Sequence, residues 1–160
     1  IELKTAVLIA ASLKIGAILG GASNKDAGDL YNFGRNLGIA FQLQDDLLDT
    51  YGDAELVGKK LGMDIVDNKK TFLMIRALQK ASREEEKTLM HWLEARDFDP
   101  AEKVRSVVAI FDKLDIKEET GNKITEYFDE ALQNLRNLKR PEERKTELYA
   151  FAEYLMKRKK

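Results

Sequence analysis

The sequence predicts an all-α protein built as a helical bundle, and three observations lead to that prediction. Only two of the 160 residues are proline, so most of the chain is free of helix breakers. There are no alternating runs of β-branched residues of the kind that favour strands. Apolar residues instead recur at the spacing of an amphipathic helix along nearly the whole chain. Because hydrophobic residues make up 44% of the sequence, these helices can bury a core of their own.

Two long helices are expected in the first third of the chain. The first should end at Gly20-Gly21, since glycine stops helices, and the second should span about residues 28–51. The apolar run 6–22 is interrupted by Lys14 and is shorter than the ~20 clean residues of a membrane span, so a core helix is favoured. The expected inward residues are Ala6, Ile9, Ala10, Leu13 and Ala17, then Leu30, Phe33, Leu37, Phe41 and Leu48.

Start signals define the helices of the middle of the chain. Residues 52–68 are expected to be a loop rich in glycine and charge, and Asn68 is expected to cap the next helix. Ser82 and Glu85 form a capping-box pattern, and Asp99-Pro100 is a cap followed by proline at the first helical position. The expected apolar positions are Phe72, Ile75 and Leu78, then Leu89, Trp92 and Leu93, then Val104, Val107, Val108 and Phe111.

Two more helices complete the expected bundle. One spans residues 117–138, and Pro141 is expected to open the last helix, which ends near Lys157. The expected inward residues of the first of these are Ile124, Tyr127, Phe128, Ala131 and Leu135.

Charge and cysteine content exclude some classes of function. The sequence has 27 basic and 28 acidic residues, so there is no general reason to expect nucleic acid as a partner. Without cysteine the chain forms no disulfide and uses no thiolate chemistry. A reducing, cytoplasmic location is compatible with that composition and is the expected one.

Three aspartates lie within about one turn of the expected second helix, at Asp45, Asp46 and Asp49. Asp45 and Asp49 are four residues apart and share a helix face, with Asp46 about 100° round the axis. Carboxylates this close repel one another unless they bind a cation, and their hard oxygens suit Mg²⁺. The alternative is an ordinary solvated acidic face, but neighbours such as Phe41 and Leu48 make the helix too apolar to be wholly exposed.

The segment after this helix combines glycine with lysine. Glycine allows tight turns, and lysine supplies point charges for phosphate oxygens. Acids that hold a metal, followed by lysines that reach the metal's phosphate, predict a diphosphate-binding site. Taken without the acids, the lysines are more typical of an ordinary solvated loop. The lysines concerned are Lys59, Lys60, Lys69 and Lys70.

These motifs together resemble those of trans-isoprenyl diphosphate synthases, which make geranyl, farnesyl, geranylgeranyl and longer diphosphates. The resemblance is to the family's second aspartate-rich region, and it extends over almost the whole chain. Lys4-Thr5 matches a Lys-Thr pair of the family, and the final Arg158-Lys159-Lys160 resembles the basic tail of some members. The matching pattern is Phe41-Gln42-x-x-Asp45-Asp46-x-x-Asp49, Gly58-Lys59, Gly62-x-Asp64-Ile65 and Lys69-x-Thr71.

The resemblance implies the C-terminal part of an isoprenoid-synthase-type fold. Residues 1–160 are then expected to be the C-terminal portion of a single synthase domain, because the chain starts without methionine and contains no other DDxxD motif. The N-terminal half with the first aspartate-rich motif would be absent, and so would the residues that set product length. The apolar faces of residues 6–17 and 30–48 are expected to pack against that half.

The implied activity is that of a polyprenyl (geranyl, farnesyl or geranylgeranyl) diphosphate synthase. In this family Mg²⁺ binds an allylic diphosphate, the diphosphate leaves, and isopentenyl diphosphate attacks the allylic cation before losing a proton. The expected partners are therefore these two diphosphates, and a homodimer in the full-length enzyme. The fragment alone is expected to be inactive because it carries half of the site.

The resemblance also assigns roles to single residues. Asp45, Asp46 and Asp49 would serve the metal, with Asp64 as a supporting acid. Thr5 and Gln42 match catalytic positions whose oxygens lie near the developing cation, although Gln42 can also be a plain helix residue. The catalytic and diphosphate-binding lysines would be Lys4, Lys59 and Lys69, and the lid over the diphosphate would be Arg158, Lys159 and Lys160.

Two other classes of function compete with this one. The chain could be a non-catalytic regulatory or assembly partner of a prenyl synthase, although the intact second motif argues against that. It could also be a structural helical domain whose acids and lysines are only surface residues. If the chain is a synthase, Lys60 and Lys70 are expected to face solvent beside the binding lysines.

Overall fold

The computed structural model describes residues 1–53 and 61–157, and every regular element in these ranges is helical. The predicted all-α class is confirmed. The described chain divides into two compact units, one made of residues 1–44 and 122–157 and the other of residues 45–53 and 61–121. Helices α2 (Asn24–Tyr51) and α8 (Ile116–Arg136) contribute residues to both units.

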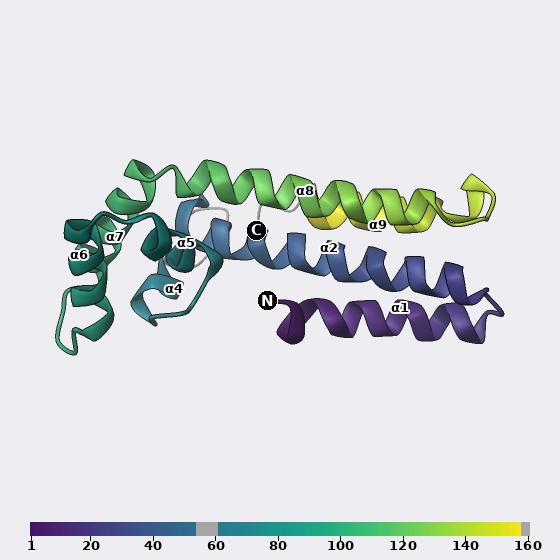
Figure 1. Ribbon diagram of the computed structural model, residues 1–160, viewed down its shortest axis with the longest axis horizontal. Helices are drawn as coiled ribbons and strands as arrows, with labels where there is room; N and C mark the ends of the chain where they lie inside the picture. Colours follow the sequence, from purple (N-terminus) through teal and green to yellow (C-terminus); the bar gives the residue numbers. More distant parts are fainter. Residues whose placement is uncertain (54–60, 158–160) are drawn as a thin grey trace. The chain divides into compact units, whose positions relative to one another are not determined.

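In the first unit, α1 (Val7–Leu19) runs alongside α2, preceded by the short π-helical turn η1 (Glu2–Ala6) (Figure 1). The two backbones approach closely at two glycines of α2. A Cβ atom on Gly34 would lie 2.9 Å from Cα of Ala10, and one on Gly38 would lie 2.6 Å from Cα of Ala6. Only glycine fits at these positions, so small residues on both helices fix how they pack.

This packing corrects one expectation from the sequence. Part of the faces 6–17 and 30–48, expected to pack against another half of the protein, is already covered within this chain. Ala6 and Ala10 lie against Gly38 and Gly34, and Phe33 and Leu37 belong to a core with α8 residues. Ala6, Ala10, Phe33 and Leu37 are fully buried. The apolar residues of α1 that remain exposed point the other way, and they are Leu8 at 73%, Ile15 at 58%, Ile18 at 54% and Leu19 at 83%.

The core of the first unit lies between α2, α8 and α9 (Thr146–Lys157). Pro141 does not open the last helix as expected. It precedes a 3₁₀ turn, η2 (Glu142–Arg144), and α9 begins only at Thr146. The turn ends at the buried Lys145, whose ammonium binds Glu142 at 2.5 Å. The buried core residues are Phe33, Leu37, Ala131, Leu135, Leu138 and Ala152.

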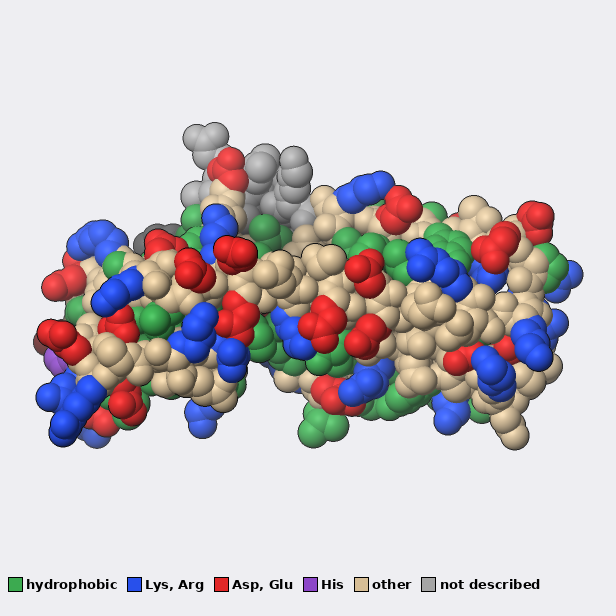
Figure 2. Space-filling model, turned by 45° about the horizontal axis from the view of Figure 1, so that its top comes forward, with side chains coloured by type: hydrophobic (Ala, Val, Ile, Leu, Met, Phe, Trp, Pro, Cys, Tyr) green, Lys and Arg blue, Asp and Glu red, His purple; other side chains and the backbone are tan. Residues whose placement is uncertain are grey.

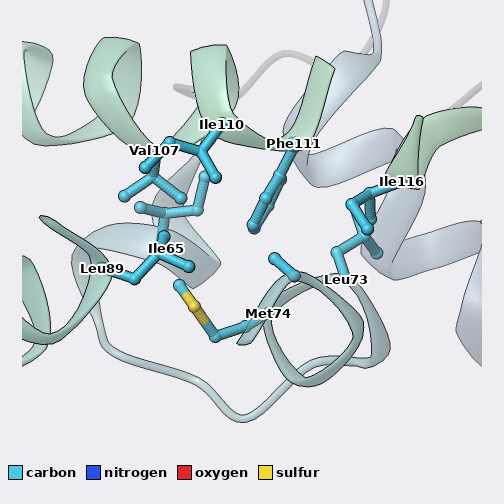
Figure 3. Close-up of a cluster of buried hydrophobic side chains, with 9 residues drawn as sticks. Ile65, Leu73, Met74, Leu89, Val107, Ile110, Phe111 and Ile116 are labelled. Atoms are coloured by element: carbon cyan, nitrogen blue, oxygen red, sulfur yellow. The ribbon is translucent and has the colours of Figure 1, made fainter. Parts of the chain in front are cut away.

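The second unit is built from short helices around a separate apolar core. These are α4 (Met63–Val66), α5 (Phe72–Lys80), α6 (Arg83–Glu94) and α7 (Pro100–Lys113), together with the start of α8. Figure 3 shows their side chains converging on one another. The members of this core are Ile65, Leu73, Met74, Ala77, Leu89, Val107, Ile110, Phe111 and Ile116.

The helix caps of this unit confirm part of the sequence prediction and correct the rest. Ser82 and Glu85 form the expected capping box, and Asp99 caps α7 ahead of Pro100. Thr71, not Asn68, caps α5, because its hydroxyl accepts the N–H of Met74. The inward face of α5 is only partly as expected. Leu78 packs against the core, but the buried residues are Leu73, Met74 and Ala77, and Ile75 is 43% exposed.

The surface is mixed in charge, as the nearly equal numbers of acids and bases predict. Acidic and basic side chains are interspersed over the face shown in Figure 2, and neither sign collects in a broad field there. Among residues 1–53 and 61–157, no helix combines the length and the apolar character that crossing a membrane requires.

Candidate functional site

The aspartates of α2 differ in exposure. Gln42, Asp45 and Asp49 follow one another at spacings of three and four, so they share a face of the helix, and each is partly exposed. Asp46 is only 6% exposed. In the two described ranges no three acidic or histidine side chains come close enough to hold a metal ion by themselves.

This donor set is compatible with Mg²⁺. Mg²⁺ is usually held by one or two carboxylates and keeps water or phosphate oxygens in its other positions. Asp45 and Asp49 can supply such carboxylates, while the buried Asp46 is turned away from open solvent. The helix therefore suits a magnesium ion that completes its shell with a diphosphate, and does not suit a closed protein cage.

Asp49 also anchors the segment that follows α2. We call residues 62–69 the strap; they include α4 and end beside α5. The N–H of Gly62 donates to the carbonyl oxygen of Asp49 at 2.6 Å, and the N–H of Asp64 donates to its Oδ2 at 2.9 Å. Burial raises the pKa of the Asp49 carboxyl, and the N–H of Asp64 partly opposes that rise. Asp49 is thus both an acid of the cluster and the point where the strap is fixed.

The strap brings an acid and a base together. Nζ of Lys69 donates to Oδ1 of Asp64 at 2.5 Å, and the N–H of Lys69 donates to the carbonyl oxygen of Asp64 at 2.9 Å. The hydrogen bond that Lys69 donates to the Asp64 carboxylate raises the pKa of Lys69. The Asp64 side chain is 14% exposed and that of Lys69 is 53% exposed. The ammonium of Lys69 is therefore paired with a largely buried carboxylate while its own side chain stays accessible to solvent.

A second pair lies in the first unit. The hydroxyl of Thr5 donates to Oε1 of Gln42 at 2.8 Å, so the start of the chain is held against α2. Lys4 is exposed next to Thr5. The oxygen positions predicted to lie near a developing cation are thus in contact with each other.

Five of the remaining predicted residues belong to two other stretches of the chain. Lys59 and Lys60 fall in the range 54–60, and Arg158, Lys159 and Lys160 form the last three positions of the chain. All five lie outside the described residues. Lys70, expected to face solvent, is exposed.

Sequence reasoning missed Lys103, the one fully buried lysine among the described residues. It lies on α7, where its Nζ contacts Asn68 and the carbonyl of Val66 in the strap. A signal was present, since position 103 is four residues before Val107 and eight before Phe111, on the buried face of the helix.

The sequence is similar to known proteins over much of its length. Residues 1–111 match the family model described as polyprenyl synthetase. A short chain isoprenyl diphosphate synthase of Methanothermobacter thermautotrophicus is 44% identical over 94 residues, which cover 59% of this chain and 29% of that protein. The curated relatives are therefore much longer than the part that matches.

Solved structures extend the likeness to the whole chain. The crystal structure of a geranylgeranyl pyrophosphate synthase matches with a TM-score of 0.87 and 36% identity, covering all of this chain and 50% of that one. Another such synthase, from Corynebacterium glutamicum, was crystallised with isoprenyl diphosphate and magnesium. It matches with a TM-score of 0.84 and 31% identity over 98% of this chain and 44% of its own. This chain spans about half the length of these structures.

Proposed function

This chain belongs to the polyprenyl synthetase family, and we therefore propose that the complete protein condenses an allylic diphosphate with isopentenyl diphosphate head to tail. Residues 1–160 would be the C-terminal portion of its catalytic domain. The relatives named as isoprenyl and geranylgeranyl diphosphate synthases support a prenyl transfer, and product length stays open.

One structural observation carries the proposal: Asp49 fixes the strap, and the strap presents Lys69 on Asp64. Loss of diphosphate from an allylic carbon places several negative charges on the leaving oxygens, and cations already in position lower that barrier. Lys69 would hold the diphosphate from the strap. The family resemblance gives a diphosphate-binding role also to Lys4 and, outside the described residues, to Lys59 and to residues 158–160.

Mg²⁺ is the cofactor that the donor set suits. Asp45 would be its main protein ligand and Asp49 a second one. Asp46, which is buried, would help to position these two carboxylates. When bound, the ion would neutralise charge on the diphosphate oxygens. The N-terminal half of the synthase would supply the facing aspartates.

The chain's own polar groups would assist the organic part of the substrate. The oxygens of Thr5 and Gln42 carry negative partial charge, which would stabilise the allylic cation once the diphosphate has left. Because Thr5 donates its proton to Gln42, its oxygen lone pairs remain directed away from that bond. A cytoplasmic homodimer remains the expected state of the full-length enzyme.

A product assay tests the proposal. The complete protein, incubated with Mg²⁺, isopentenyl diphosphate and an allylic diphosphate, should form a longer prenyl diphosphate. The double variant Asp45→Ala, Lys69→Ala should not. A complete, folded protein that forms no product from any short allylic diphosphate would instead support the non-catalytic regulatory or assembly role.

A further inference from the structure

The strap is held from two sides within the second unit. On one side Asp49 binds the N–H groups of Gly62 and Asp64. On the other side, two consecutive residues of α7 contact it: Val104 lies against its first residue, and Lys103 binds residues near its end. A Cβ atom on Gly62 would lie 2.7 Å from a methyl carbon of Val104, and Gly62 has φ of +77°, so only glycine fits there.

Lys103 holds the opposite end. Its Nζ donates to Oδ1 of Asn68 at 2.6 Å and to the carbonyl oxygen of Val66 at 3.3 Å, and it lies 4.3 Å from the centre of the Phe98 ring. The side chain is fully buried, so burial lowers its pKa. An ammonium is costly to bury, and an apolar side chain would fill the same space more cheaply. These contacts therefore require an explanation other than core packing.

The contacts fix the bend of the strap. Asn68 has φ of +55°, a left-handed conformation that residues other than glycine seldom adopt. Both polar atoms of its carboxamide are hydrogen-bonded. Nδ2 donates to the carbonyl of Leu93, and Oδ1 accepts from Lys103. The chain reverses at this point, and the next residue, Lys69, turns back onto Asp64 through its N–H and its Nζ.

We propose that Lys103 is a positioning residue whose buried ammonium holds the strap in the one conformation that places Lys69 on Asp64, and that it thereby sets the affinity for a diphosphate. The second clause rests on the proposed function, and the first does not. Lys103 need not touch the diphosphate, because it acts through Asn68 and Lys69.

Hydrogen exchange tests the positioning directly. In Lys103→Met, exchange of the amides of Asp64 and Lys69 should speed up by about tenfold or more beyond any change in global stability. The matched control is Arg105→Met, an exposed residue two positions along the same helix, which should leave both amides unchanged. Unchanged exchange in Lys103→Met would overturn the proposal.

A double-mutant cycle separates the named contact from general damage to the core. Asn68→Gly removes the carboxamide and tolerates the positive φ, so it tests the same contact from its other side. Because Asn68→Gly also removes the bond to Leu93, it should speed exchange of Lys69 at least as much as Lys103→Met does, and adding Lys103→Met to it should change the rate by less than about twofold. Additive effects would show that Lys103 does not act through Asn68.

Binding of inorganic pyrophosphate with Mg²⁺ to the complete protein tests whether Lys103 sets the affinity for a diphosphate. Lys103→Met should weaken binding about fivefold or more in the wild-type background and much less in Lys69→Ala. Equal weakening in both backgrounds would overturn the link to Lys69. If the wild-type protein binds no pyrophosphate, the proposed function and this effect of Lys103 on affinity fail, while the exchange result still decides the positioning role.

Discussion

The hydroxyl of Thr5 donates a hydrogen bond to the side-chain oxygen of Gln42 at 2.8 Å, across 37 positions of sequence. Gln42 lies three residues before Asp45 on the same helix. The contact therefore fixes the start of the chain against the helix that carries the aspartates. The sequence predicts a role for each residue, but that they bind each other follows only from the structure.

This contact predicts a measurable coupling between the two side chains. Thr5→Val and Gln42→Met keep the shape of each side chain and remove its hydrogen bond, so their effects on the free energy of unfolding should couple by about 0.5–1.5 kcal/mol. Ser12→Ala is the control, because the Ser12 hydroxyl binds the carbonyl of Leu8 instead. The effects of Ser12→Ala and Gln42→Met on the free energy of unfolding should be additive. Additive effects of Thr5→Val and Gln42→Met would contradict the contact.

Asp45 should matter most among the three aspartates for catalysis. In the complete enzyme Asp45→Ala is expected to lower turnover more than about tenfold, which corresponds to ~1.4 kcal/mol of activation free energy. The reason is that Asp45 is partly exposed and shares its face with Asp49, while Asp46 is buried.

The control for this prediction is Asp129→Asn, an exposed aspartate of α8. It should leave both turnover and stability unchanged. Wild-type turnover in Asp45→Ala would remove this residue from the site. If the aspartates are only a solvated face, Asp45→Asn should also change the free energy of unfolding by less than ~0.5 kcal/mol.

Adjacent lysines of the strap region should differ in their effect on the reaction. Lys69→Ala in the complete enzyme should weaken binding of the allylic diphosphate or slow its ionisation, because it removes the cation paired with Asp64. Lys70→Ala, one position on and exposed, should have a much smaller effect. The sequence makes the same prediction for Lys59 against Lys60. Steady-state kinetics that show equal losses in all four variants would favour a diffuse basic loop.

Glu85 predicts how the stability of the second unit depends on pH. Its ion pair with Lys113 at 2.7 Å, together with the N–H of Ser82, lowers the pKa of this carboxyl from 4.5 to about 2. A carboxyl with a lowered pKa stabilises the folded state fully above its unfolded pKa. That stabilisation is lost as the pH falls from 4.5 towards 2.

Chemical denaturation between pH 6 and pH 2, about the range in which carboxyl groups titrate, checks this prediction. Glu85→Gln can still accept the N–H of Ser82 but loses the ion pair, so its stability should fall less steeply with acid than that of the wild type. The neighbouring, exposed Glu86→Gln should follow the wild type. A parallel decline in all three proteins would show that Glu85 contributes nothing to acid sensitivity.

The sequence predicted the long helices and the capped helices well, because their signals are local. The Ser82 and Glu85 box and the Asp99-Pro100 start each need only neighbouring residues. Helix α4 escaped prediction because it has four residues and begins after Gly62 without a side-chain cap. Asn68 looked like a cap, but its side chain is committed to Leu93 and Lys103, which are distant in sequence.

The candidate site could be predicted by residue type but not by contact. Aspartates at helical spacing, followed by glycines and lysines, are visible in the sequence alone. The bonds from Asp49 to the strap, and the burial of Lys103 behind it, depend on tertiary packing. A lysine on an amphipathic helix is usually placed on the solvent side, and only its register with Val107 indicated otherwise.

The outward face of α1 predicts the behaviour of residues 1–160 on their own. Leu8, Ile15 and Leu19 lie along one stripe of the helix and are 73%, 58% and 83% exposed. Exposed apolar surface of this kind favours association. We expect the isolated chain to self-associate through this stripe, and sedimentation velocity at several concentrations should show it. Replacing these three residues by glutamine should disperse the oligomers, whereas Phe151→Gln with Tyr154→Gln, two exposed aromatic residues of α9, should not.

The isolated chain should also lack prenyl transfer and bind Mg²⁺ only weakly, because a diphosphate must be clamped from two sides and these residues supply one. Adding the N-terminal half of the synthase, covalently or in trans, should restore product formation from isopentenyl diphosphate in the same assay. It should also reduce the association, since an apolar face that a second half covers is no longer available to another copy. Efficient synthesis by residues 1–160 alone would show that the two-sided site is wrong. Recovery of activity with undiminished association would show that the stripe on α1 is not where the N-terminal half packs.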